Sequence, residues 1–118
     1  MKFAIMLNES PLESKAGHIA SQFIIKALNQ GHSILRVFLY GDAIYHAYPE
    51  AQMAPTSSRL QLPQGLSTPI DVVFCLSAAE RRGFIIPKDL SHPEPGFRPG
   101  GLGLWIDALK DADQFIQF

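Results

Sequence analysis

The sequence predicts an α/β fold, a three-layer sandwich in which helices cover both faces of a small, mostly parallel sheet. Three observations support this prediction. Short apolar runs alternate along the chain with amphipathic segments of helical spacing. The run at residues 70–76 is almost continuously apolar, as expected of a strand that is covered on both faces. The chain has 118 residues, 47% of them apolar, which suits a single domain over residues 1–118.

The first three elements are predicted to be a strand, a helix and a strand. Residues 2–7 form a short apolar run that ends at a polar turn. Between residues 14 and 30 apolar positions recur every three or four residues, and Gly31 follows as a helix stop. Residues 33–40 are rich in β-forming side chains, and Gly41 marks their end. This order indicates two parallel strands with a right-handed crossover, in a flavodoxin-like winding.

The middle of the chain is predicted to be a loop followed by a strand and a short helix. Residues 41–48 are typical of a short helical turn, and residues 49–69 are rich in Pro, Ser, Thr and Gln without periodicity. We expect a long mobile loop over residues 49–69, of the kind that covers a site, meets a partner or is disordered. The apolar run at residues 70–76 is the third strand, and residues 77–82 form a short helix closed by Gly83.

The last third of the chain returns to regular structure after a proline-rich stretch. Residues 84–86 favour a brief extended piece, and residues 87–99, which contain four prolines, are predicted to be irregular. Residues 100–110 regain helical spacing, with glycines at the entry to the helix. Residues 113–118 alternate between polar and apolar side chains, which predicts a terminal strand of the same sheet.

Composition excludes several classes of function. The formal net charge is −1, which argues against direct binding of nucleic acid. The apolar run at the amino terminus is too short for a signal peptide, and no later segment is long enough to span a bilayer, so we expect a cytoplasmic protein. A single cysteine excludes an internal disulfide. No Cys/His ligand set or phosphate-binding loop is present, so we expect neither a metal nor a cofactor.

Cys75 is the main candidate for chemistry. It ends the third predicted strand and precedes a helix, at the edge where open α/β sheets bind ligands. A thiolate at this position would face the unpaired amides of the helix that follows. A lone cysteine between Phe74 and Leu76 is equally typical of inert core packing. The residues alone leave both interpretations open.

Two neighbouring groups are candidate partners of Cys75. Arg81 and Arg82 lie roughly 9 Å beyond it along the predicted helix, so we expect them to complement the helix dipole, or to form a docking or anion-binding surface, rather than to activate the thiol. His46 follows the second strand and would lie at the same sheet edge, where it is a candidate base. The simpler expectation for His46, as for His18, His32 and His92, is a solvated surface position.

Two further features have a structural and a functional interpretation. The segment Gly100-Gly101-Leu102-Gly103 resembles a backbone nest for a phosphate, but it lacks a clear preceding strand, so close packing is favoured. Tyr45, Tyr48 and Met53 would suit a protein interface if they are exposed, or the edge of the core if they are not.

Three segments together resemble a known family. They are residues 73–83 (Val-Phe-Cys-Leu-Ser-Ala-Ala-Glu-Arg-Arg-Gly), residues 37–45 (Val-Phe-Leu-Tyr-Gly-Asp-Ala-Ile-Tyr) and residues 101–118. In this order they resemble the DsrE-like sulfurtransferases, above all the TusD type. The resemblance covers nearly the whole chain and implies the DsrE-like α/β fold. It also implies that Cys75 is catalytic and carries sulfane sulfur as a persulfide.

The resemblance implies partners as well. Other sulfur-carrier proteins would act as donor and acceptor, and related small subunits would complete a hetero-oligomer. The relay would serve tRNA 2-thiouridine synthesis or sulfur oxidation. Release of the sulfur requires that a second thiolate reaches it, so a partly exposed Cys75 is expected. The alternatives are a noncatalytic scaffold subunit of such an oligomer and a module that binds a small ligand.

Overall fold

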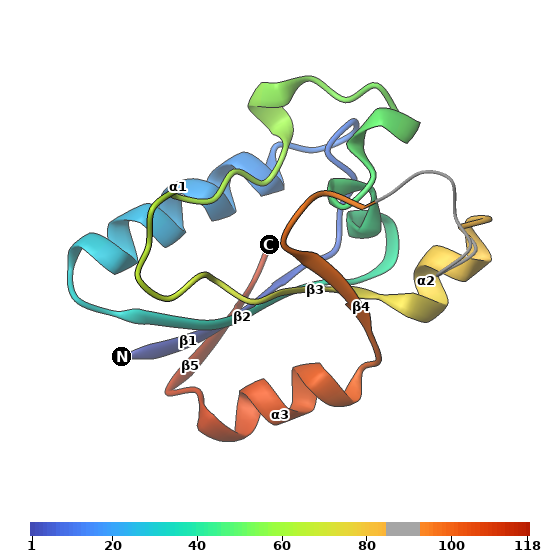
Figure 1. The fold of residues 1–118 in the computed structure, drawn as a ribbon. Coiled ribbons are helices and arrows are strands. Elements are labelled where there is room, and N and C mark those ends of the chain that lie inside the picture. Colours follow the sequence, from blue (N-terminus) through green and yellow to red (C-terminus); the bar gives the residue numbers. More distant parts are fainter. Residues whose placement is uncertain (85–92) are drawn as a thin grey trace.

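The computed structural model describes residues 1–84 and 93–118. Within these residues five strands form one parallel sheet with the order β4-β3-β2-β1-β5 (Figure 1). The strands are β1 (Lys2–Leu7), β2 (Ser33–Leu39), β3 (Val72–Cys75), β4 (Phe97–Gly100) and β5 (Gln114–Gln117). The α-helices are α1 (Ala16–Asn29), α2 (Leu76–Arg81) and α3 (Gly103–Asp111). Short 3-10 turns are η1 (Gly41–His46), η2 (Pro49–Ala51) and η3 (Thr56–Ser58).

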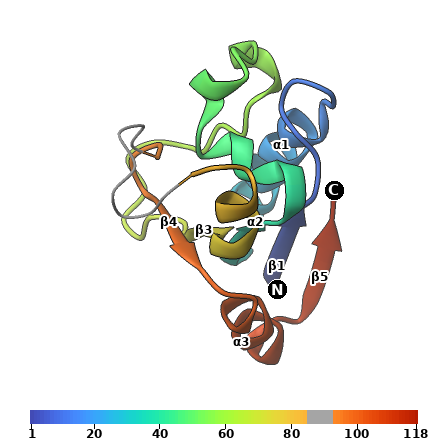
Figure 2. The same cartoon turned by 90° about the vertical axis from the view of Figure 1, so that its right-hand side faces the viewer.

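Helices α1 and α3 lie on opposite faces of the sheet, which confirms the predicted three-layer arrangement (Figure 1). On one face, Phe23 of α1 packs edge-on against Phe3 of β1, with ring centroids 5.2 Å apart. On the other face, Trp105 of α3 packs against Phe38 of β2 at 6.3 Å. The short α2 does not cover a face but lies beside η1 at the carboxyl end of the sheet (Figure 2).

The core follows from the alternation of side chains along the strands. Ile5, Val37 and Phe74 are among the fully buried side chains on the α1 face, and Phe38 and Val73 are fully buried on the α3 face. All four residues of β3 are buried. The continuous apolar run that predicted this strand is therefore the result of cover on both faces.

The segment at residues 49–69 folds back over α1 and contains η2 and η3. The side chain of Arg59 donates hydrogen bonds to the carbonyl of Ala54 at 2.9 and 2.6 Å. The backbone N–H of Gln61 donates to Oγ of Ser21 in α1 at 2.8 Å. These contacts tie the segment to itself and to α1, and its predicted mobility stays a prediction.

Two expectations change at the residue level, and a third falls largely outside the described residues. The irregular stretch predicted to reach Pro99 is wrong at its end, because Phe97–Gly100 form the edge strand β4. Pro99 lacks an N–H and is tolerated there because an edge strand pairs on one side only. The last helix begins at Gly103 rather than at Gly100. The predicted extended piece falls largely on residues 85–92, which lie outside the described residues.

No α-helix among residues 1–84 and 93–118 has both the length and the apolar character that a membrane crossing requires.

Candidate functional site

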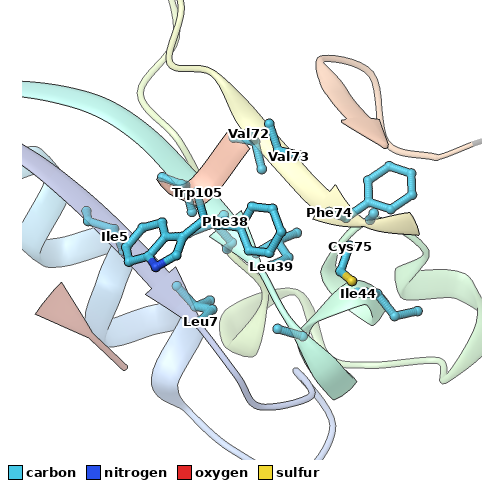
Figure 3. Close-up of a cluster of buried hydrophobic side chains, with 14 of the residues drawn as sticks. Ile5, Leu7, Phe38, Leu39, Ile44, Val72, Val73, Phe74, Cys75 and Trp105 are labelled. Atoms are coloured by element: carbon cyan, nitrogen blue, oxygen red, sulfur yellow. The ribbon is translucent and has the colours of Figure 1, made fainter. Parts of the chain in front are cut away.

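Cys75 is the last residue of β3 and lies opposite Gly100 of β4. Its backbone is extended (φ −66°, ψ 115°), and the next residue begins α2. Because side chains alternate along a strand, Cys75 shares the α3 face with Val73. Figure 3 shows the sulfur among the apolar side chains of the core, on the side toward Ile44 of η1. The predicted position at the carboxyl edge of the sheet is therefore confirmed.

The thiol is buried, which contradicts the expectation of a partly exposed cysteine. Only 6% of Cys75 is exposed. Among the described residues its sulfur has no hydrogen-bond partner, and the expected contact with the amides of α2 is not formed. A second thiol therefore reaches the sulfur only if side chains around the end of β3 move.

Arg82 joins α2 to η1 and does not contact the thiol. Its Nη2 and Nε donate to Oδ1 of Asp42 at 2.7 and 3.0 Å, and its Nη1 donates to the carbonyl of Ala78 at 2.8 Å. The hydrogen bond from Nη1 of Arg82 satisfies the carbonyl of Ala78 in α2, as expected of a cation at a helix C-terminus. Arg81 is exposed.

His46 is a structural residue, and both interpretations based on sequence are wrong for it. Its side chain is buried, with only 3% of the residue exposed, rather than solvated. Nδ1 accepts a hydrogen bond from the N–H of Leu60 at 3.0 Å, and Nε2 donates to the carbonyl of Glu9 at 3.2 Å. Burial lowers the pKa of His46 to about 4, and the hydrogen bond to Glu9 opposes this shift. With both ring nitrogens engaged, His46 is not available as a base for Cys75.

The glycine-rich segment packs closely at its first residue only. Strand β4 precedes it directly, so the absence of a preceding strand was a wrong expectation. A Cβ atom on Gly100 would lie 2.5 Å from Cδ1 of Leu104 and 2.9 Å from Cγ1 of Val73, whereas Gly101 and Gly103 have no such neighbour. Glycine at position 100 therefore lets α3 approach the sheet beside Cys75.

An ion cluster on the α3 face was missed by sequence reasoning. Oδ2 of Asp71 accepts from Nε of Arg36 at 2.7 Å, and Oδ1 of Asp71 accepts from Nε of Arg98 at 2.9 Å. Arg36 also donates to the carbonyl of Leu104 in α3 at 2.6 Å. Hydrogen bonds from Arg98, opposed by burial and assisted by Arg36, hold the pKa of Asp71 below its ordinary value. The four residues come from separate parts of the chain, so no local pattern indicated the cluster.

The two predicted interface aromatics differ in exposure. Tyr48 is only 3% exposed, and its ring stacks on Phe84 with centroids 4.1 Å apart, so it belongs to the core. Tyr45 is half-buried, whereas Met53 is 86% exposed. Of the three, Met53 alone presents a large apolar surface.

A hollow of about 540 Å³ lies between residues 56–64 and residues 94–97. Its lining includes His46, Arg59 and Phe97. Phe97 is the partner of Val72, so the hollow opens on the α1 side of the sheet, and Cys75 does not line it. The hollow and the thiol are therefore separate features.

Comparison with known proteins places these features in context. The chain matches the DsrE/DsrF-like family over residues 1–118. It is 33% identical over 130 residues to the sulfurtransferase DsrE of Allochromatium vinosum, with 100% of this chain and 98% of that protein covered. It is 31% identical over 130 residues to the sulfurtransferase TusD of Salmonella newport, with 100% of both chains covered.

Among solved structures, the crystal structure of the ychN protein from E. coli superimposes with a TM-score of 0.69. The match covers 100% of this chain and 99% of the other at 20% sequence identity. This likeness concerns the fold alone.

Proposed function

The chain belongs to the DsrE/DsrF-like family, and from this we propose that it is a sulfurtransferase subunit that carries sulfane sulfur on Cys75. The names of the relatives from Allochromatium vinosum and Salmonella newport support a role in sulfur relay at the level of the family. The observation that supports Cys75 is its place: the chain's single cysteine ends β3 at the carboxyl edge of the sheet.

Loading is a thiolate attack on a donor persulfide. The Sγ of Cys75 attacks the terminal sulfur of the donor, a new S–S bond forms on Cys75, and the donor's own S–S bond breaks. The electron pair of the broken bond leaves with the donor's inner sulfur as a thiolate. The terminal sulfur is transferred with its proton, so no external oxidant or reductant is needed.

Release repeats the same exchange in the other direction. A thiolate of the acceptor protein attacks the terminal sulfur of the Cys75 persulfide, the bond between the two sulfurs breaks, and Cys75 leaves as the thiolate. One cysteine is enough, because the donor and the acceptor each supply their own thiol. The burial of Cys75 suits storage, since it limits access of small thiols to the persulfide.

The partners we propose are other sulfur-carrier proteins, together with related small subunits in a hetero-oligomer. The pathway is either tRNA 2-thiouridine synthesis or sulfur oxidation, in the cytoplasm. This chain has a near-neutral charge, so we assign the contact with any tRNA to another protein of the relay.

Intact-mass spectrometry tests the assignment. Purified wild type is incubated with a persulfide donor, and Cys75→Ser is treated in parallel. We expect the wild type to gain the mass of one sulfur atom, which a reductant removes, and the variant to gain none. Equal loading of the two proteins would overturn the proposal.

One observation favours a second candidate. Because Cys75 is only 6% exposed, the chain also fits a noncatalytic scaffold whose partner subunit carries the sulfur. Sulfur transfer through the assembled complex distinguishes the two candidate functions. Cys75→Ala should stop this transfer if Cys75 is the carrier and leave it unchanged if the chain is a scaffold.

A further inference from the structure

Tyr40 directly follows β2, and the register of β2 and β3, extended by one residue, places its backbone beside that of Cys75. Leu39 of β2 lies opposite Phe74 of β3. One residue further along both strands, the same register sets Tyr40 next to Cys75. The backbone of Tyr40 is still extended (φ −112°, ψ 151°), and its N–H donates to the carbonyl of Leu7 at 2.9 Å. This hydrogen bond continues the pairing with β1 for one residue beyond β2, and neighbouring strands of a sheet are about 4.8 Å apart.

The two side chains leave the sheet on the same face. Tyr40 follows Phe38 by two residues, and their rings stack with centroids 6.5 Å apart and planes at 28°. Cys75 follows Val73 by two residues, and Val73 is the partner of Phe38. Since side chains alternate along each strand, Tyr40 and Cys75 both project from the α3 face at its carboxyl end.

Tyr40 lies at the boundary between the core and the solvent. It is 39% exposed, whereas Cys75 is 6% exposed. In the part of the chain that the structure describes, the Tyr40 hydroxyl has no hydrogen-bond partner. A phenol can donate one hydrogen bond, so Tyr40 brings a donor group to the backbone position beside Cys75.

The proposed reaction creates a need for such a donor. When the acceptor removes the terminal sulfur, the electron pair of the broken bond stays on Sγ of Cys75, in an apolar environment where an unpaired charge is costly. A hydrogen bond to a charged atom offsets part of this cost. We propose that the Tyr40 hydroxyl donates a hydrogen bond to the sulfur of Cys75 when that sulfur is anionic. This inference rests on the proposed function and adds a second catalytic residue to it.

Three arginines around this end of the sheet are paired with carboxylates, whereas Arg81 of α2 is exposed. Arg82 of α2 binds Asp42 of η1 at 2.7 Å. Arg98 of β4 and Arg36 of β2 both bind Asp71. Glu80 of α2 and Asp107 of α3 are exposed. These three arginines are thus held by carboxylates, whereas the hydroxyl of Tyr40 is a neutral donor on the α3 face.

Tyr40→Phe tests the proposal, because it removes the hydroxyl and keeps the ring that stacks on Phe38. The rate of alkylation of Cys75 by iodoacetamide is measured against pH in the full chain. We expect the midpoint of the pH profile to move up by about one pH unit in Tyr40→Phe, since a hydrogen bond to an anion is lost. The rate of sulfur transfer from loaded Cys75 to a small thiol should fall about tenfold.

Tyr45→Phe is the matched control. Tyr45 lies in η1 shortly after the same strand, but its ring packs against Phe84, with centroids 6.0 Å apart. We expect the alkylation profile and the transfer rate of Tyr45→Phe to equal those of the wild type. Thermal melting checks that both variants are folded.

The outcomes separate this inference from the proposed function, because alkylation needs no persulfide. If Tyr40→Phe and wild type share one alkylation profile and one transfer rate, the role of Tyr40 is overturned while sulfur loading on Cys75 stands. If the profile of Tyr40→Phe shifts but wild type accepts no sulfur, the hydrogen bond is supported and the proposed function fails.

Discussion

His46 and Cys75 lie at the same end of the molecule, are buried to a similar degree, and differ in how their polar atoms are satisfied. The exposed fractions are 3% and 6%. Both ring nitrogens of His46 are hydrogen-bonded to backbone groups, whereas among the described residues the sulfur of Cys75 has no hydrogen bond. Burial alone does not separate these two residues, whereas the hydrogen bonds of their side chains do, and the residue without them is the one for which we propose chemistry.

This difference predicts opposite effects of substitution. His46 joins the loop after β1, the segment at residues 49–69 and η1, so its replacement should cost stability rather than sulfur transfer. Among the described residues Cys75 packs in the apolar core and has no hydrogen bond, so a small substitution there should cost activity rather than stability. The predictions below test this contrast, beginning with the largest effect.

The largest expected effect on stability is that of His46→Leu. The carbonyl of Glu9 and the N–H of Leu60 lose their partners in the protein, and each buried orphan group costs about 1–3 kcal/mol. We expect the free energy of unfolding in urea to fall by about 2–5 kcal/mol. His18→Leu, at an exposed position of α1, is the control and should change it by less than about 0.5 kcal/mol. Equal stability of the two variants would contradict the contrast.

Stability should also depend on pH through His46. Its pKa is about 4 in the folded chain and has an ordinary value of 6.5 in the unfolded chain, so between these values the unfolded state binds more protons. The contribution is fully present above pH 6.5 and is lost as the pH falls from 6.5 to 4, by about 3 kcal/mol in total.

Urea unfolding at a series of pH values measures this dependence. His46→Gln should show a flatter profile than the wild type between the two pKa values. The pKa of Asp71 is lowered, so its contribution to the free energy of unfolding is lost as the pH falls below the ordinary carboxyl range. This loss lies below the pH range in which His46 titrates. Identical slopes in wild type and His46→Gln would assign the pH dependence to another group.

Gly17→Ala addresses the surroundings of His46. A Cβ atom at this position would contact Cε1 of the His46 ring and lie 2.9 Å from the backbone carbonyl oxygen of Ser58. We expect a loss of about 1–3 kcal/mol in the free energy of unfolding, because a buried ring and a backbone group must shift. Gly103→Ala is the control, since a Cβ there meets no atom within 4 Å. Its melting temperature should match or exceed that of the wild type.

The smallest effect is expected for Arg82→Ala. The ion pair with Asp42 is partly exposed, with side-chain exposures of 24% and 55%, so its loss should cost no more than about 1 kcal/mol. Sulfur loading of Cys75 should be unchanged, because Arg82 contacts Asp42 and Ala78 rather than the thiol. A large fall in loading with an unchanged melting temperature would make Arg82 part of the site.

Much of the fold could be predicted from local patterns. Strand β3 was predictable because cover on both faces requires an apolar run, and α1 because one face is buried. Strand β4 was not, because an edge strand accepts Pro99 and an exposed Arg98, which remove the usual signals of a strand.

The candidate site was predictable in position but not in environment. The place of Cys75 follows from where its strand ends, which the sequence shows. The burial of Cys75, the double hydrogen bond of His46 and the ion cluster of Asp71 depend on segments far apart in the chain. The place of Tyr40 beside Cys75 likewise depends on segments far apart in the chain, since it follows from the register of β2 and β3.

The central claim, that Cys75 rather than His46 performs the chemistry, is tested most directly by a single-turnover discharge experiment. Wild type and His46→Gln are loaded with sulfane sulfur and mixed with an acceptor thiol, and the sulfur on the peptide that contains Cys75 is followed by mass spectrometry. We predict that the sulfur leaves this peptide and appears on the acceptor at the same rate in both folded proteins. Sulfur that stays on Cys75, or that moves only when His46 is present, would contradict the account.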